Sequence, residues 1–117
     1  RGPLVRTSRG VAVRSVKAVM KGTMKVLWTE QAFARLAKIE DFVAGRDPVA
    51  AARLSGRLVS RARSLARFPR RGRRVPELPT SELRELIEGP YRIVYRVRGN
   101  AVEVLTVFEG HFPMPRL

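Results

Sequence analysis

The chain has 117 residues, and its 24 lysines and arginines against 10 aspartates and glutamates give a formal net charge of +14. This length suits one domain, the absence of cysteine excludes a disulfide scaffold, a thiol nucleophile and any Cys-ligated metal, and no apolar run approaches the roughly 20 residues that cross a bilayer. We therefore expect one soluble domain with anionic partners, either nucleic acid or an acidic protein segment, and no membrane partner.

Residues 1–23 differ from the rest of the chain, because they carry six basic and no acidic side chains and follow no clear strand or helix period. Three interpretations are open: a leader or upstream-translated segment, an expression remnant, or a basic arm that binds nucleic acid. Met24 then opens an apolar run. We expect residues 1–23 to be a basic N-terminal extension, flexible or not native, and residues 24–117 to form the working domain. That domain keeps 18 basic against 10 acidic residues.

The first part of the domain predicts a strand followed by a helix. Met24–Trp28 is suited to a short strand, and Thr29 is a plausible N-cap for the helix after it. The helix is expected to end near Gly45, because apolar residues recur every three or four positions up to that point, at Ala32, Leu36, Ile39 and Val43.

A second helix is predicted to begin at Asp47-Pro48, since an N-cap residue followed by proline is a common helix start. Its apolar positions recur up to Leu65, and Phe68-Pro69 stops it. With only a turn between them, the two helices should form an antiparallel hairpin whose apolar stripes need a cover.

Three predicted strands supply this cover, at Leu83–Glu88, Tyr91–Arg98 and Ala101–Phe108. Gly89-Pro90 and Gly99-Asn100 are two-residue turn patterns between them. The expected fold class is therefore α+β, with a short N-terminal strand and an antiparallel helix hairpin packed on an antiparallel C-terminal sheet.

A tight hairpin at Gly99-Asn100 sets the expected register of the last two strands. It places Val94 opposite Leu105 and Arg96 opposite Glu103, so that Arg96 and Glu103 form a cross-strand ion pair on a basic face of the sheet. The tyrosines of this hairpin, like Trp28, are expected in the core. The pairs expected to face the helices are Val97–Val102, Tyr95–Val104, Ile93–Thr106 and Tyr91–Phe108.

The densest charge in the chain lies in a loop after the second helix. It has two interpretations: a solvated connector without a partner, or a site that captures phosphate or carboxylate, which guanidinium groups bind bidentately at any physiological pH. If the helices cover the other face of the sheet, a continuous cationic surface should run from Arg73 and Arg74 to Arg92 and Arg96. The arginines of the loop are Arg67, Arg70, Arg71, Arg73 and Arg74.

Few catalytic groups are available. There is no Gly-rich phosphate loop and no His or carboxylate pair at metal-ligand spacing, so no metal or other cofactor is expected. The remaining chemistry is metal-free RNA cleavage, in which the 2′-hydroxyl attacks and the protein supplies cations and a base. In the structural alternative, Arg96 pairs with Glu103, and Arg92 caps the sheet or holds Glu85 or Glu88. The side chains available for catalysis are Arg92, Arg96, Glu77, Tyr91 and His111.

Two segments, GRRVPEL at 72–78 and LRELIEGPYRIVYRV at 83–97, resemble the RelE/ParE toxin superfamily of bacterial type II toxin–antitoxin systems. The order of strand, helix hairpin, basic loop and antiparallel strands is similar as well, and the resemblance covers about residues 24–110. It implies a cytoplasmic, growth-inhibiting toxin with a role in plasmid stabilisation. It also implies a cognate antitoxin that occupies the basic groove and carries any contact with operator DNA.

The resemblance implies one of two mechanisms, because one branch of the superfamily cleaves messenger RNA on the ribosome and the other inhibits DNA gyrase. Arg92 matches an arginine of the nuclease branch, and Glu77 resembles the position of a glutamate that some nucleases use as a base. Leu83 and Glu85 stand where nucleases carry lysines. The segment 109–112 also lacks the arginine that such toxins often place after its glycine.

These departures favour a gyrase-directed toxin over the first alternative, a ribosome-dependent mRNA endonuclease. A non-toxic basic nucleic-acid-binding module is the second alternative. If the chain is a nuclease, the catalytic candidates are Arg92, Glu77 and His111. The residues expected to bind the target or the antitoxin are Arg71, Arg73, Arg74, Arg84, Arg92 and Arg96.

Overall fold

The computed structural model describes residues 4–6, 12–15 and 24–117. All the strands and helices that the sequence predicts are present. In chain order the elements are β1 (Leu4–Arg6), β2 (Ala12–Ser15), β3 (Lys25–Thr29), α1 (Glu30–Ala44), α2 (Pro48–Arg63), the short 3₁₀ turn η1 (Ser64–Ala66), β4 (Arg73–Arg74), β5 (Arg84–Glu88), β6 (Tyr91–Arg98) and β7 (Ala101–Glu109).

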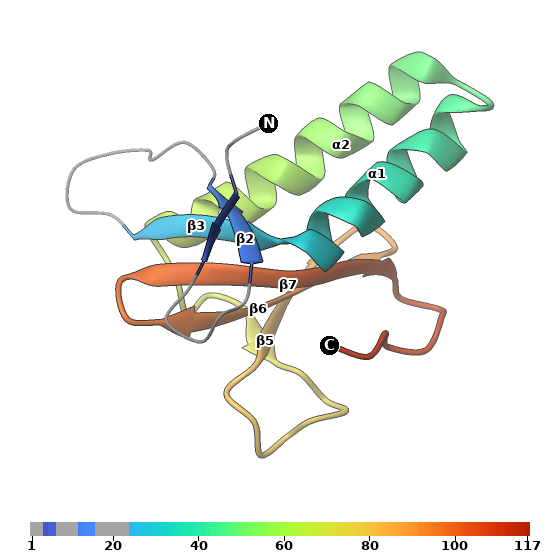
Figure 1. Cartoon of the computed structure of the whole chain (residues 1–117). Coiled ribbons are helices and arrows are strands. Elements are labelled where there is room, and N and C mark those ends of the chain that lie inside the picture. The colour runs from blue at the N-terminus through green and yellow to red at the C-terminus, as the bar shows by residue number, and fades with distance from the viewer. Residues whose placement is uncertain (1–3, 7–11, 16–23) are drawn as a thin grey trace.

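One sheet and one pair of helices make up the fold (Figure 1). The strand order is β1-β2-β3-β7-β6-β5-β4. β3 and β7 run parallel, and the other neighbouring strands run antiparallel. α1 and α2 lie together on one face of the sheet, which leaves its other face to loops and the C-terminal segment (Figure 1). The predicted α+β class is confirmed.

The helix starts follow from local capping. Thr29 Oγ1 accepts a hydrogen bond from Ala32 N at 3.1 Å and donates one to Leu105 O at 3.0 Å, so the cap of α1 is also tied to β7. Asp47 caps α2 by accepting hydrogen bonds from two backbone N–H groups, each at 3.1 Å. Gly45 follows α1, as predicted.

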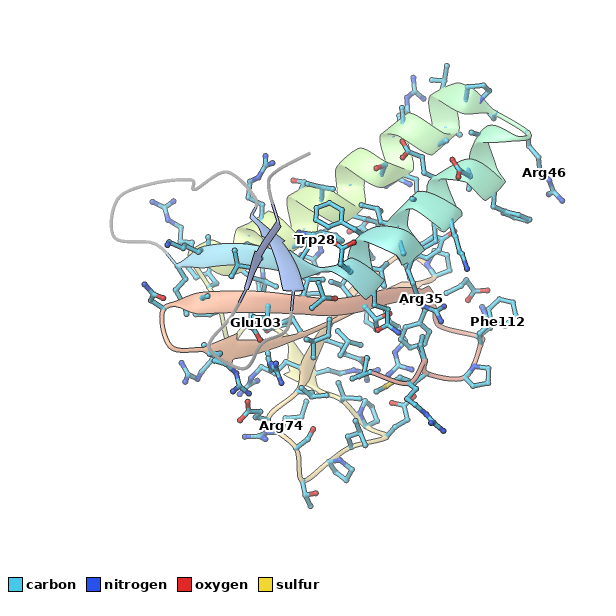
Figure 2. The ribbon with its side chains drawn as sticks, viewed as in Figure 1. Trp28, Arg35, Arg46, Arg74, Glu103 and Phe112 are labelled. Atoms are coloured by element: carbon cyan, nitrogen blue, oxygen red, sulfur yellow. The ribbon has the colours of Figure 1, made fainter. Side chains whose placement is uncertain are left out.

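The main core lies between the helix pair and the sheet. Trp28, Leu58 and Tyr95 are fully buried there, and the Trp28 ring lies 5.6 Å from the Phe33 ring, centroid to centroid. Figure 2 places Trp28 between β3 and the helices. The expectation that Trp28 and Tyr95 are core residues is confirmed, and Tyr91 packs against the same core, partly buried.

A β-bulge corrects the predicted register of the last hairpin. The register shifts between Val94 and Tyr95, and each pair beyond that point lies one residue farther along β7 than expected. Because side chains alternate along a strand, the shift moves Phe108 to the face away from the helices and puts Val107 in its place. The observed pairs beyond the bulge are Val94–Thr106, Ile93–Val107, Arg92–Phe108 and Tyr91–Glu109.

Two strands lie in the N-terminal segment, where none was predicted. β2 pairs antiparallel with β3, with Val13 opposite Thr29 and Ser15 opposite Leu27, and β1 pairs with β2. They extend the sheet beyond β3. The remainder of residues 1–23 lies outside the described residues, so the interpretation of this segment as a basic extension stays a prediction.

The core also fixes the loop that follows η1. The buried Tyr95 hydroxyl donates a hydrogen bond to Pro69 O at 2.8 Å and accepts one from Gly72 N at 2.9 Å. Burial raises the pKa of this hydroxyl above its ordinary value of 10.0, which keeps the donor protonated. A Cβ atom at Gly72 would stand 2.6 Å from both Glu85 O and the Tyr95 hydroxyl, so no larger residue fits without movement of the backbone.

Replacement of Gly72 by alanine is therefore expected to destabilise the fold. The added methyl group would overlap the backbone of β5 and the Tyr95 ring, a clash that costs about 2 kcal/mol in the free energy of unfolding. This corresponds to a fall in melting temperature of roughly 10 °C, which circular dichroism would measure.

Gly56→Ala is the matched control. Gly56 lies in α2, and a Cβ atom there meets no heavy atom within 4 Å. Since alanine favours a helix over glycine, this variant should gain about 0.5–1 kcal/mol. Equal melting temperatures for the two variants would contradict the close packing around Gly72.

Candidate functional site

The candidate site lies on the face of the sheet opposite the helices. A small second core of Val75, Val94 and Phe108, with Leu83 and Met114 packed against it, covers part of this face. Charged side chains surround that cluster. Figure 2 shows Glu103 on the central strand β7 and Arg74 on the edge strand β4.

Glu85 stands at the centre of an ion-pair network on this face. Its side chain is 0% exposed. Its Oε1 accepts a hydrogen bond from Arg92 Nε at 2.7 Å and lies 2.6 Å from Arg92 Nη2. Its Oε2 accepts a hydrogen bond from Arg73 Nε at 2.7 Å and lies 2.7 Å from Arg73 Nη2. A buried carboxylate requires such compensation, because an unpaired charge away from water is strongly unfavourable. The two arginines are therefore structural partners of Glu85.

Arg92 makes a second, bidentate pair with Glu77. Its Nη1 and Nη2 donate to Glu77 Oε2 and Oε1, each at 2.7 Å, and its guanidinium carbon lies 4.9 Å from the centre of the Phe108 ring. The Arg92 side chain is only 12% exposed. Hydrogen bonds from Arg92 lower the pKa of Glu77 from 4.5 to about 2, and the hydrogen bond to Glu77 raises the pKa of Arg92.

The expected cross-strand pair is present on the same face. Arg96 Nε donates to Glu103 Oε1 at 2.7 Å, in a pocket where the Glu103 side chain is nearly fully buried. Arg98 approaches Glu82 at 3.4 Å and Glu103 at 3.9 Å. Two strand arginines are thus matched by carboxylates of neighbouring segments.

The remaining three predicted binding residues, Arg71, Arg74 and Arg84, donate to neutral oxygens. Their partners are the Ser64 hydroxyl at 3.1 Å, the Ser81 carbonyl at 2.6 Å and the Gly72 carbonyl at 2.7 Å, respectively. Within residues 24–117, no carboxylate forms an ion pair with any of the three.

The expected continuous cationic surface from Arg73 and Arg74 to Arg92 and Arg96 is therefore corrected. Glutamates neutralise Arg73, Arg92 and Arg96, whereas the other four arginines of the loop after α2 have no carboxylate partner within residues 24–117: Arg67, Arg70, Arg71 and Arg74. The physical reason is that Glu85 and Glu103 lie on strands directly beside these arginines. The binding roles of all six arginines stay predictions.

His111 stands apart from the Arg92–Glu77 pair. Its Nδ1 lies 2.6 Å from Glu109 Oε1, its backbone N–H donates to the same oxygen at 2.7 Å, and its side chain is 85% exposed. Both contacts lower the pKa of Glu109, and the hydrogen bond from the His111 backbone has the larger effect. Within the described segments, no hydrogen bond or ion pair joins His111 to either of the other two catalytic candidates. The structure brings two of the three together.

His111 instead lines a hollow of 680 Å³ between α1 and the C-terminal segment. Arg35 of α1 and Phe112 lie at this end of the sheet (Figure 2). The part of the chain that the structure describes contains no group of three or more His, Asp or Glu side chains that could hold a metal ion.

The sequence analysis misses one ion pair of the site and misplaces one residue. It names Glu85 or Glu88 as alternative partners of Arg92, but it does not identify Arg73 as the second partner of Glu85, and it places Phe108 on the helix side. A useful sign was available for Glu85. It is an acidic residue that alternates with the apolar residues Leu83 and Ile87 on one face of a short strand, where a charge needs a partner.

Comparisons with known proteins bear on the whole domain. A family model described as the ParE toxin of the type II toxin–antitoxin system parDE matches residues 26–111. The protein named Toxin RelE2, from Caulobacter vibrioides, is 40% identical over 84 residues, which cover 71% of this chain and 91% of that protein. A protein designated Y4kP, from Sinorhizobium fredii, is 37% identical over 93 residues, which cover 80% and 95%.

A solved structure shares the fold. It is titled as the chromosomal ParDE toxin–antitoxin system from P. aeruginosa, and it matches with a TM-score of 0.60 and 26% sequence identity. The match covers 70% of this chain and 90% of that chain. The helix hairpin and the C-terminal sheet are therefore shared with a toxin–antitoxin protein.

The Glu77–Arg92 pair predicts a specific pH dependence. Because the pKa of Glu77 is lowered to about 2 in the folded state, its ionised form contributes stability above the ordinary pKa of 4.5, and that contribution is lost as the pH falls toward 2. Compared with Glu77→Gln, the wild-type protein should therefore lose its stability advantage between these two pH values. Melting temperatures measured across this range test the prediction.

Arg92→Lys provides the second readout. Lysine keeps the charge but removes the planar fork, so the carboxyl ¹³C resonance of Glu77 should titrate at a higher pH in this variant than in the wild type. A wild-type midpoint at the ordinary value of 4.5 would contradict the bidentate pair.

Proposed function

The chain belongs to the ParE toxin family of type II toxin–antitoxin systems, and from this premise we propose that it arrests bacterial growth by inhibiting DNA gyrase. Its partner in such a system is an antitoxin, which we propose neutralises it. The names of the relatives include both ParE and RelE, so the choice of target rests on this chain's own residues.

The observation that carries the proposal is the neutralisation of Arg92. A nuclease that works without a metal must place free positive charge beside the phosphorane that forms during cleavage. Here the guanidinium of Arg92 is held by two carboxylates, Glu85 and Glu77, and its side chain is mostly buried. The donors that would stabilise a reacting phosphate are already occupied.

The two other nuclease candidates are also unsuited to catalysis. A general base works best when its pKa is near the working pH, and a Glu77 carboxylate with a pKa of about 2 binds protons weakly at neutral pH. His111 is turned toward Glu109. These features support an inhibitor that acts by binding rather than by cleavage.

Binding is assigned to the uncompensated arginines. We expect Arg71, Arg74 and Arg84 to meet an acidic segment of the target or of the antitoxin, because their guanidinium groups have only neutral partners among residues 24–117. Arg73, Arg92 and Arg96, which are paired with glutamates, have a structural role: they shape the surface that lies between the binding arginines. Operator DNA is contacted through the antitoxin alone.

The second candidate is the ribosome-dependent mRNA endonuclease. It is favoured by the direct contact of Arg92 and Glu77, which resemble nuclease residues. Cleavage would require Glu77 to swing away, which would free Glu77 and Arg92 Nη1 while Glu85 still holds Arg92 Nε and Nη2.

The proposal places the toxin in the bacterial cytoplasm, where gyrase and ribosomes are found. In the described part of the chain, no helix has the length and apolar character needed to cross a membrane.

The proposed target is tested with purified components. The full chain should block supercoiling of a relaxed plasmid by gyrase in a dose-dependent manner, and it should leave messenger RNA intact on translating ribosomes. Arg71→Gln/Arg74→Gln should raise the inhibitory concentration at least about tenfold, because two charged contacts are lost. Normal supercoiling together with cuts at fixed positions in the messenger would overturn the proposal in favour of the nuclease.

Growth arrest separates the candidates in cells. Induced Glu77→Gln and His111→Gln variants should still arrest growth, because neither residue is a catalyst in the proposed mechanism. The nuclease mechanism predicts that Glu77→Gln relieves the arrest. Unaffected growth with soluble wild-type protein would contradict both mechanisms and favour the non-toxic nucleic-acid-binding module.

A further inference from the structure

A second feature of the surface lies at the end of α2, in the loop of residues 67–71. Phe68 is 57% exposed there, unusual for a large aromatic side chain, and the guanidinium carbon of Arg71 lies 5.8 Å from the centre of its ring. Arg67, Pro69 and Arg70 complete the lining of a hollow of 420 Å³ around this ring. An aromatic surface and three cations therefore share one small depression.

The charge in this hollow is uncompensated. In the stretch from Met24 to Leu117, none of Arg67, Arg70 and Arg71 has an ion-pair partner. A fourth cation, Arg84, lies close to the loop, because its Nη1 donates to the backbone carbonyls of Arg70 at 3.4 Å and Gly72 at 2.7 Å. Four positive charges gather here, and repulsion among them favours an anionic ligand.

The loop is also held in place before any ligand arrives. The N–H groups of Phe68 and Arg71 donate to Ser64 O and Phe68 O, both at 3.2 Å. Tyr95 holds Pro69 and Gly72 from the core, as described above. A preorganised loop loses little conformational entropy on binding, so its exposed ring and cations are available at low cost.

We propose that this hollow binds single-stranded nucleic acid, with one base stacked on Phe68 and the adjoining phosphates on Arg67, Arg70 and Arg71. Stacking on an exposed aromatic ring together with phosphate contacts from basic residues is the general physics of single-strand binding. An acidic segment, which is proposed above to meet Arg71 and Arg84, accounts for the cations, and a stacked base accounts in addition for the exposed ring beside them. DNA and RNA both supply the base and the phosphodiester that this site requires. The proposed binding does not depend on whether gyrase or the ribosome is the target of the toxin.

The chain offers a matched control at the far end of the helix pair. Phe42 is 69% exposed, and the guanidinium carbon of Arg46 lies 5.4 Å from its ring centre. Figure 2 shows Arg46 at the helix–helix turn, whereas the hollow follows the opposite end of α2. This arginine has two acidic residues close in sequence, Asp41 and Asp47. The pair of Phe42 and Arg46 should not bind a phosphodiester chain.

The experiment measures the fluorescence anisotropy of labelled dT₁₂, rU₁₂ and a 12-base-pair DNA duplex with the purified full chain. Phe68→Leu should weaken binding of at least one single strand about tenfold, the effect of losing one stacked base. It should leave duplex binding unchanged, because paired bases are not available to stack. Phe42→Leu should leave every affinity unchanged, and Arg67→Gln/Arg70→Gln should lower the salt dependence of single-strand binding.

Other results would overturn the site. If Phe68→Leu and Phe42→Leu changed the affinities equally, or if Phe68→Leu weakened single-strand and duplex binding equally, base stacking on Phe68 would be excluded. The binding would then be unspecific attraction to positive charge. A further contrary result is that Phe68→Leu binds the oligonucleotides as tightly as the wild type and that poly-glutamate displaces them equally well from both proteins. This result would assign the loop to an acidic protein. Phe68 is exposed, so Phe68→Leu should fold; circular dichroism checks this. Neither gyrase nor ribosomes are present, so failure here leaves the proposed function standing.

Discussion

A buried carboxylate governs the face of the sheet on which the chemistry of this fold would take place. Glu85 cannot remain ionised away from water without partners, and the nearest cations are Arg73 and Arg92. Once Arg92 is bound to Glu85, its outer edge takes Glu77 as well. A region rich in arginine in the sequence thus becomes a closed, electrically balanced network. The chain resembles the nuclease branch at Arg92 and Glu77, but in this network two carboxylates already hold the guanidinium of Arg92 that would stabilise a reacting phosphate.

The arginines of this protein serve two different purposes. Three strand arginines, Arg73, Arg92 and Arg96, are matched by glutamates on neighbouring strands, and these pairs help to fix strand pairing. Those in the loop after α2 are held by a core tyrosine through the backbone and point their charge outward. Tyr95 is therefore the link between the two parts, because it belongs to the core and at the same time shapes the loop. We propose that a partner of the toxin meets charge mainly at this loop.

The parts of the structure that could be predicted are those that depend on neighbours in the chain. Thr29 and Asp47 cap their helices by bonding to residues two or three positions away, and a two-residue turn at 99–100 correctly aligned Arg96 with Glu103. The alignment failed beyond the bulge, since an extra residue in a strand leaves no mark in the alternating pattern. Phe108 was misplaced for that reason alone.

The sequence by itself determined the α+β class, the order of the two helices and of strands β3, β5, β6 and β7, the family and the strong positive charge, because composition, caps, turns and short motifs all act over a few residues. Only the tertiary structure decided which arginines remain available to a partner. Arg73, Glu77, Glu85 and Arg92 come from three separate segments, and they meet because β5 pairs with both β4 and β6. Charge compensation depends on distance in space, and folding sets that distance.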